Sequence, residues 1–119
     1  MKSCSIEFTE ECAEWLYGLN ESEQVDVMAV IGLLKELGPQ LKHPYSSGIE
    51  GSVYSHMREL RIQHKGNPYR ILYAFDPARS AILLLGGNKK GDNRWYKKII
   101  PKAEKLYRQH LENMTTRRK

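Results

Sequence analysis

The stretch ELRIQHKGNPYRILYAFDPARSAILLLGGNKK, residues 59–90, decides the fold. Apolar and polar residues alternate at 59–63, and aromatic or aliphatic residues recur at every second position of 69–75, which is typical of strands. The turn-forming segments KGNP and DPARS separate these runs. Residues 81–85 are nearly all apolar, so this strand should lie in the centre of a sheet or be covered on both faces. The sequence therefore predicts three antiparallel strands, the last of which ends at the Gly86-Gly87 pair.

Two helices and a short strand are predicted before this sheet. Residues 2–8 alternate as a strand does, and Thr9 can cap a short helix after it. Asn20, with Glu23 three residues later, forms the capping-box pattern at the start of a longer helix that Gly38 ends. The side chains expected to face the core in the strand and first helix are Cys4, Ile6, Phe8, Ala13, Leu16 and Tyr17.

The remaining segments complete an α+β domain. Residues 39–56 contain Pro and Gly and predict a connecting loop. Asp92 can cap a helical segment after the sheet, Pro101 is placed to begin a further helix, and residues 114–119 are expected to form a frayed basic tail. The element order is β-α-α-β-β-β-α, and the 119 residues suit a single domain.

Several classes of protein are disfavoured by composition. The chain has no apolar run of membrane-spanning length and no signal-peptide pattern, so we expect a cytoplasmic protein that does not contact a membrane. Cys4 and Cys12 are too few for a disulfide framework and are interpreted as core residues. His43 and His56 have no second ligand at metal-binding spacing. We therefore expect neither a metal nor a cofactor.

The net charge of +5 conceals two oppositely charged parts. Residues 88–119 carry eleven Lys or Arg and three acids, which gives +8, whereas residues 1–87 carry eight basic and eleven acidic side chains, which gives −3. A molecule polarised in this way can present its basic end to a polyanion and another face to a protein partner. A solvated basic helix would give the same counts, so charge alone does not decide between the two interpretations.

Cations within the predicted sheet suggest a site that binds phosphate. Cleavage of RNA by its own 2′-hydroxyl requires a base, cations that stabilise the phosphorane and an acid for the 5′-oxygen, and it requires no metal. Arg61 and Arg70 suit the cationic role, because a guanidinium binds phosphate oxygens bidentately and stays charged at working pH.

Other side chains could supply the proton transfers. Lys89 or Lys90 could add charge or exchange a proton, His64 and Glu59 are candidate bases, and Tyr96 is a candidate acid or base-stacking platform. The basic residues expected to contact RNA around this group are Arg58, Arg94, Lys97 and Lys98.

Each candidate also has a purely structural interpretation. Arg61 lies two positions from Glu59 on the same strand face, so the two can form an ordinary ion pair. Tyr96 and Trp95 could be core residues of a helix, and His64, just before a turn, could be solvated.

These residues carry a resemblance to a known family. MRELR at 57–61, YRILYAF at 69–75, ILLL at 82–85 and the pair Lys89 and Lys90 resemble the signature of the phage-derived, HigB-like toxins in the RelE/ParE superfamily. The resemblance covers most of the chain. It implies a RelE/ParE-like fold and a type II toxin that cleaves mRNA, usually on the translating ribosome. It also implies neutralisation by an antitoxin that typically has a helix-turn-helix domain.

The resemblance assigns a role to some residues and leaves the roles of others open. By position, Arg70 matches the arginine of the central strand motif and Arg61 that of the preceding one. Lys89 and Lys90 match the basic residues after the last strand, and the resemblance does not indicate which of the two is functional. The chain lacks the C-terminal His-Tyr or Arg-Tyr ending of some relatives, so the base and the acid stay unassigned. We expect the antitoxin to cover part of the two N-terminal helices or the basic groove.

Two other functions remain compatible with this sequence. One is a non-enzymatic, ParE-like toxin that inhibits DNA gyrase by binding. The other is a phage protein that binds RNA or the ribosome electrostatically without cleavage, with strongly salt-dependent affinity. Arg61 and Arg70 favour the nuclease, because a pure binder does not need two arginines facing one pocket.

Overall fold

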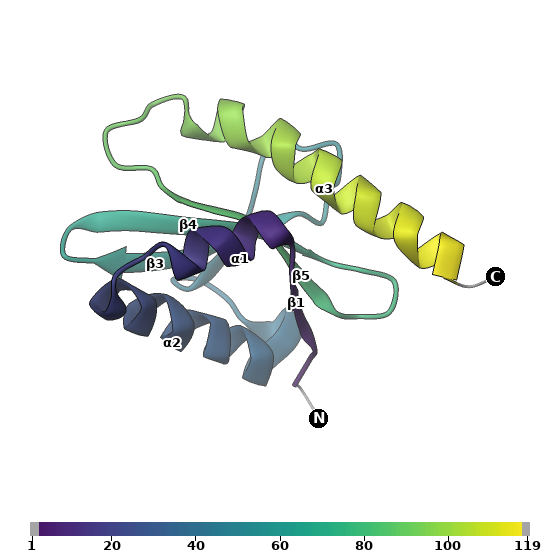
Figure 1. Cartoon of the computed structure of the whole chain (residues 1–119), viewed down its shortest axis with the longest axis horizontal. Helices are drawn as coiled ribbons and strands as arrows, with labels where there is room; N and C mark the ends of the chain where they lie inside the picture. The colour runs from purple at the N-terminus through teal and green to yellow at the C-terminus, as the bar shows by residue number, and fades with distance from the viewer. Residues whose placement is uncertain (1–2, 118–119) are drawn as a thin grey trace.

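A five-stranded sheet forms the centre of the computed structural model, which describes residues 3–117 (Figure 1). The strand order is β1-β5-β4-β3-β2. The strands are β1 (Ile6–Phe8), β2 (Ser46–Gly48), β3 (Arg58–His64), β4 (Asn67–Phe75) and β5 (Ala81–Asn88). The helices are α1 (Glu10–Tyr17), α2 (Glu21–Leu37) and α3 (Trp95–Arg117), with a short 3₁₀ helix at Gly38–Gln40.

The predicted α+β fold is confirmed, and so are its three central strands. β3, β4 and β5 pair antiparallel, while β1 joins the free edge of β5 in parallel. One strand was not predicted: β2 lies within the expected loop at 39–56 and pairs with β3 at the other edge. Its sequence is SSG, and three small residues are too few to show an alternating pattern.

Both predicted N-terminal helix caps are confirmed. The hydroxyl of Thr9 accepts a hydrogen bond from the backbone N–H of Cys12 at 3.0 Å. At the start of α2, the side chain of Asn20 accepts from the N–H of Glu23, and the Glu23 carboxylate accepts from the N–H of Asn20, each at 2.8 Å. These bonds satisfy donors that a helix start leaves free, so both helices begin where the sequence places them.

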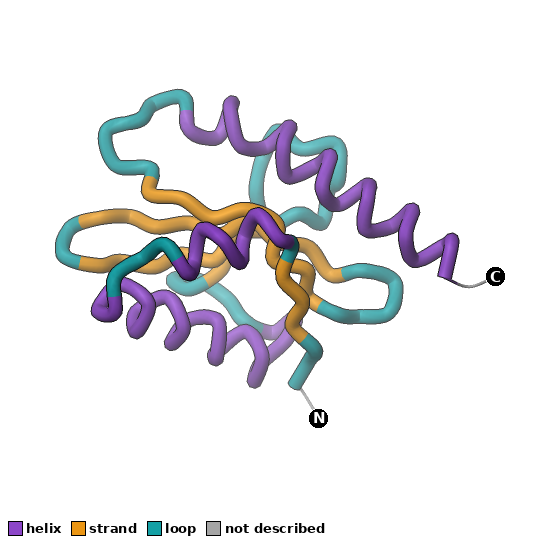
Figure 2. The backbone as a smooth tube through the Cα atoms, in the orientation of Figure 1, coloured by secondary structure: helices purple, strands orange, loops and turns teal. Residues whose placement is uncertain are grey.

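The helices α2 and α3 lie on opposite faces of the sheet, as Figure 2 shows. α1 and α2 pack on one face, in a core that contains Leu16, Val27, Leu34, Leu60, Ile71 and Leu83. α3 packs on the other face, in a core that contains Met57, Leu72, Ile82, Leu84, Ala103 and Tyr107. None of the helices in the described part of the chain is long and apolar enough to cross a membrane.

The expected buried side of β1 and α1 is only partly correct. Cys12 and Leu16, four residues apart and therefore on one helix face, turn toward the sheet and are buried. Burial raises the pKa of the Cys12 thiol to about 12, as expected for an inert core cysteine. Tyr17, expected in the core, is 80 % exposed, and Phe8 on the edge strand is 39 % exposed.

β5 does not end at the two glycines but continues through them to Asn88. A Cβ atom on Gly86 would lie 2.3 Å from Trp15 of α1, and one on Gly87 would lie 2.9 Å from Trp95 of α3. The glycines therefore let one tryptophan from each helical layer approach the strand backbone from opposite sides.

The C-terminal helix corrects a second expectation. α3 is one continuous helix with Pro101 inside it, rather than two helices divided at that residue. Proline removes the bond from residue 101 to the carbonyl of Lys97, but both residues are exposed, so water can reach that carbonyl. Ile100 and Ala103 are buried on the opposite side and hold the helix on the sheet. Of the segment expected to fray, 114–117 is helical, and 118–119 lies outside the described residues.

We expect Gly86→Ala to destabilise the protein, because the added methyl group must displace the Trp15 ring or the strand. Overpacking of this kind costs about 1–3 kcal/mol. Gly32→Ala is the matched control: its Cβ meets no atom within 4 Å in α2, and alanine stabilises a helix by roughly 1 kcal/mol over glycine. Urea unfolding of both variants measures the difference. An equal or higher stability of Gly86→Ala would contradict the close packing of Trp15.

Candidate functional site

A cluster of charged side chains lies on the α3 face of the sheet, close to the start of that helix. Glu59 and Arg61 are two positions apart on β3 and therefore point to the same face. Arg70 lies directly opposite Arg61 in the antiparallel pairing with β4. Tyr96, in the first turn of α3, reaches the same group. Strand alternation and cross-strand register thus bring together three of the residues proposed from the sequence, and the first turn of α3 adds Tyr96 as a fourth.

The Glu59 carboxylate is the centre of this cluster and is 4 % exposed. The Tyr96 hydroxyl donates to Glu59 Oε1 at 2.6 Å, and the Ser47 hydroxyl donates to Oε2 at 3.1 Å. Arg61 Nη1 donates to Oε2 at 3.2 Å, so the alternative of an Arg61–Glu59 ion pair is realised. Arg70 Nε lies 3.7 Å from Oε1, within ion-pair range but beyond hydrogen-bond distance.

Arg70 is a buried cation whose hydrogen-bonding capacity is not fully used. The residue is 4 % exposed, and its Nη1 donates to the backbone carbonyl of Tyr69 at 3.0 Å. Among the residues that the structure describes, its Nε is the one buried side-chain polar atom without a hydrogen-bond partner. Burying a guanidinium costs free energy unless it is paired, and a donor without a partner adds to that cost. An unmet requirement of this kind is typical of a site that binds something else.

Tyr96 is held in its protonated form. Burial raises its pKa to about 12, the hydrogen bond and negative charge of Glu59 act in the same direction, and the positive Arg70 opposes them. Lys89 Nζ lies 5.7 Å from the centroid of the Tyr96 ring, which places a third cation at the rim of the cluster. At neutral pH the Tyr96 hydroxyl therefore carries a proton that it can donate.

The balance of charges favours an anionic ligand. Two cationic side chains, from Arg61 and Arg70, lie beside the single carboxylate of Glu59, and a third, from Lys89, lies over the Tyr96 ring. A site in which cations exceed carboxylates attracts phosphate, and two guanidiniums on adjacent strands can contact the same phosphate group.

His64 is not part of this cluster. It lies five positions from Glu59, an odd separation on a strand, and so points to the opposite face. There its Nδ1 lies 2.5 Å from Asp26 of α2, and its Nε2 lies 3.3 Å from the hydroxyl of Ser22. The ring stacks on Tyr69. His64 joins β3 to α2 and is buried, so it is neither a solvated residue nor placed to act as the base.

The other predicted basic residues lie outside the cluster. Arg58 is also at an odd separation from Glu59, and its Nε donates to Ser46 at 3.1 Å. Lys90 is exposed in the turn after β5. Three more are exposed at the start of α3, one of them paired with Asp92 at 2.8 Å: Arg94, Lys97 and Lys98.

Ser47 was missed by reasoning from the sequence. It lies in β2, which pairs Ser47 with Glu59 across the edge of the sheet. No sequence signal distinguishes this serine from its neighbours, because the strand is three residues long. Within residues 3–117, no group of three or more His, Cys, Asp or Glu side chains is arranged to hold a metal ion.

The fold is that of RelE-like toxins. A mutant of the E. coli toxin RelE in the free state matches with a TM-score of 0.59 at 12 % identity, over 87 % of this chain and 96 % of that one. The toxin-antitoxin complex RelBE2 from Mycobacterium tuberculosis contains a chain that matches with a TM-score of 0.53 at 17 % identity, over 72 % of this chain and 98 % of that one.

Sequence comparison places the chain within this class. The family model described as phage derived protein Gp49-like matches residues 14–108. The Mycobacterium tuberculosis protein named "Putative toxin HigB3" is 45 % identical over 76 % of this chain and 78 % of its own length. "Putative toxin HigB2" of the same organism is 41 % identical over 86 % of this chain, which spans 52 % of that relative's length. The chain belongs to the Gp49-like, phage-derived family of HigB-like toxins.

Alkaline pH tests the environment of Tyr96. A tyrosine ordinarily ionises at pH 10.0, whereas the pKa of Tyr96 in the folded chain is about 12. Between these values the unfolded chain binds fewer protons than the folded chain, so the free energy of unfolding falls as pH rises. We expect this decline to be less steep in Tyr96→Phe, which lacks the ionising hydroxyl. Urea titrations at several pH values measure both slopes, and equal slopes would contradict the assigned environment.

Proposed function

We propose that this toxin is a metal-independent endoribonuclease that cleaves mRNA, acting on the translating ribosome in the cytoplasm. The observation that carries the proposal is the buried Arg70, directly opposite Arg61 and beside the Glu59–Tyr96 hydrogen bond. On one face of the sheet, this arrangement provides cations that can bind a phosphate. It also provides a proton acceptor and a proton donor.

The cleavage step follows from these groups. The 2′-hydroxyl of the RNA attacks the adjacent phosphorus, so an O2′–P bond forms while the P–O5′ bond breaks. Glu59 takes the proton of the 2′-hydroxyl, and Tyr96 gives its proton to the departing 5′-oxygen. Arg61 and Arg70 stabilise the charge that develops on the non-bridging oxygens, where fixed donors in a largely buried site are most effective. Lys89 adds positive charge at the rim.

The same arrangement explains how the free site is kept intact. Without RNA, Glu59 provides the negative charge that Arg61 and Arg70 require. A phosphate group entering the site would take over part of that role, and Arg70 Nε offers it a donor with no competing hydrogen bond in the described residues.

The surroundings of the site suit a long polyanion. Arg94, Lys97 and Lys98 are exposed at the start of α3 and can contact neighbouring phosphates of the RNA or of the ribosome. The partner that restrains the activity would be a cognate antitoxin with a helix-turn-helix domain. Support comes from the solved RelE-like chains, which include toxin-antitoxin complexes.

We expect Arg70→Ala and Arg70→Lys to abolish mRNA cleavage after brief induction, as measured by primer extension on a reporter mRNA. Lysine keeps the charge but loses the planar, two-pronged donor geometry, so it should not rescue activity. Arg108→Ala is the matched control, because Arg108 is exposed on α3 and thirteen residues, roughly 20 Å of helix, beyond Trp95.

Circular dichroism establishes whether each Arg70 variant is folded. Discrete new 5′ ends that require both Arg70 and translation would establish a ribosome-dependent ribonuclease. A folded Arg70→Lys variant that still cleaves mRNA would remove Arg70 from the catalytic set. Growth arrest by the wild type with intact mRNA would redirect the assignment to inhibition of gyrase by binding.

Tyr96→Phe tests the proton donor with little change in shape. A positioned acid contributes about 10²–10⁴-fold to the rate, so we expect a loss in that range for single-turnover cleavage of bound mRNA. RNA binding should persist, because Arg61 and Arg70 remain. A rate within about threefold of wild type would show that another group donates the proton, with Lys89 the nearest alternative.

A further inference from the structure

The loop at residues 49–57, between β2 and β3, is hydrogen-bonded to the middle of α3. Glu104 Oε2 accepts from the Ser52 hydroxyl at 2.9 Å and from the backbone N–H of Val53 at 2.7 Å. In Figure 1 the chain between these two strands rises from the sheet to the helix. One carboxylate oxygen of α3 therefore holds two donors of the loop.

A second residue of α3 contacts the same loop. The Tyr107 hydroxyl lies 2.9 Å from His56 Nε2, and its ring packs edge-to-face on Tyr54 with the centroids 4.9 Å apart. Tyr107 also donates to the backbone carbonyl of Phe75 in β4 at 2.8 Å, so it belongs to the core as well. The side chain of Glu104, by contrast, forms hydrogen bonds with the loop alone among residues 3–117.

Both ends of this loop lead directly into the charged cluster. Ser47 lies two residues before the loop, and Glu59 lies two residues after it. Tyr96 lies on α3 itself, eight residues or roughly 12 Å of helix before Glu104. Ser47 and Tyr96 both donate to the Glu59 carboxylate. The contact between the loop and α3 therefore joins the three segments that supply the carboxylate and these two donors.

Apolar packing by itself does not fix the place of α3 on the sheet. Ile100 and Ala103 are buried against the sheet, but such contacts are non-directional and tolerate small shifts of a helix. Hydrogen bonds are directional, and those of Glu104 fix the helix relative to the loop. The bond from Tyr96 to Glu59 is 2.6 Å long, so a shift of about 1 Å would take it beyond hydrogen-bond range.

We infer that Glu104 is a positioning residue, which binds the loop between β2 and β3 and so holds α3 where the Tyr96 hydroxyl reaches Glu59. Glu104 itself lies outside the charged cluster and contacts none of its members. The inference rests on the proposed function for the role of Tyr96 as proton donor, but the position of Tyr96 can be measured without RNA.

Ionisation of Tyr96 is the direct measure of its position. At pH 10.0 an ordinary tyrosine is half ionised, whereas a pKa of about 12 leaves about one Tyr96 in a hundred ionised. The tyrosinate absorbance of each protein, minus that of the same protein carrying Tyr96→Phe, isolates this residue among the seven tyrosines. We expect the ionised fraction to rise about tenfold or more in Glu104→Ala, because the hydroxyl moves away from Glu59 and toward water. Circular dichroism at the same pH establishes that the chain is folded.

Cleavage and rescue follow from the same displacement. We expect single-turnover cleavage of mRNA to fall about 10–100-fold in Glu104→Ala, the size of effect that a misplacement of about 1 Å produces. Glu104→Gln should stay within about threefold of wild type with Tyr96 protonated, because its amide oxygen can accept both bonds. Ser52→Ala removes one bond from the loop side and should show a smaller loss of the same kind. If Glu104→Ala does not fold, Ser52→Ala decides the test.

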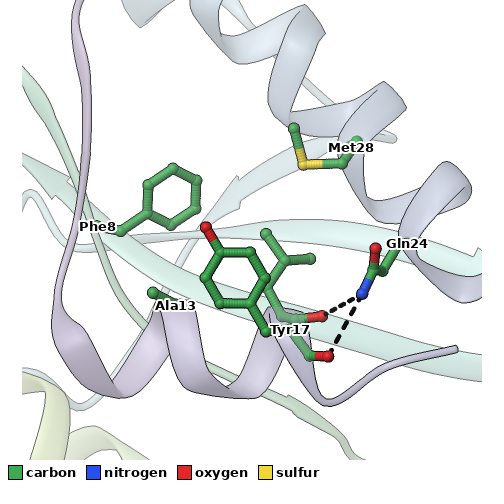
Figure 3. Close-up of a pocket in the computed structure, with 6 residues that line it drawn as sticks. Phe8, Ala13, Tyr17, Gln24 and Met28 are labelled. Atoms are coloured by element: carbon green, nitrogen blue, oxygen red, sulfur yellow. Dashed lines mark hydrogen bonds between the residues drawn. The ribbon is translucent and has the colours of Figure 1, made fainter. Parts of the chain in front are cut away.

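Two control variants separate positioning from general effects. Glu112→Ala removes the same side chain from an exposed site eight residues further along α3. Leu16→Ala lowers the stability of the other layer, because Leu16 is buried beside an apolar hollow that is also lined by Phe8, Tyr17 and Met28 (Figure 3). Both variants should keep Tyr96 protonated at pH 10.0.

The outcomes distinguish this inference from the proposed function. Intact mRNA with the wild type, together with an ionised Tyr96 in Glu104→Ala, would remove the ribonuclease and keep the positioning role. A folded Glu104→Ala that cleaves at the rate of an active wild type, or that keeps Tyr96 protonated, would overturn the inference. Equal ionisation of Tyr96 in Leu16→Ala would also overturn it, because any loss of stability would then have the same effect.

Discussion

Glu59 and Arg70 are buried side by side on one face of the sheet, and the structure around them satisfies most of what that burial requires. Removing one partner from a buried ion pair costs about 3–5 kcal/mol, because the other charge stays uncompensated. Here Ser47, Arg61 and Tyr96 surround the carboxylate with hydrogen bonds. These side chains come from β2, β3 and α3, so the hydrogen bonds to the carboxylate require the edge strand and the last helix as well as the β3–β4 pair. Among residues 3–117, Arg70 Nε is the one buried side-chain polar atom left without a hydrogen bond.

The sheet separates two surfaces of opposite charge. α3, with six basic and two acidic residues, covers the face that holds the charged cluster, whereas α1 and α2, on the other face, carry seven acidic residues and one basic residue. Because charges on opposite layers are far apart relative to the roughly 8 Å screening length at physiological salt, each surface can attract its own partner.

Local chemistry explains which features could be predicted. Thr9 and the Asn20–Glu23 pair begin helices because their side chains bond to backbone donors three residues away. Alternation defines β3 and β4, and the same alternation puts Glu59 with Arg61 and turns His64 away. A strict count of odd and even positions would have removed His64 and Arg58 from the candidate set. By contrast, local chemistry does not predict β2 or the continuity of α3. β2 is only three residues long. α3 continues through Pro101 because its buried side packs on the sheet and the carbonyl of Lys97 faces water.

The sequence by itself determined the order of the main elements, the helix starts and the presence of Arg61 and Arg70 on adjacent strands, because these depend on spacing and on bonds between near neighbours. Only the tertiary structure decided that β5 runs through Gly86 and Gly87, that Ser47 reaches Glu59, and that Tyr17 and Phe8 stay at the surface. Those features depend on contacts between segments far apart in the chain, where the packing of Trp15, Trp95 and α3 against the sheet settles which side chains are covered.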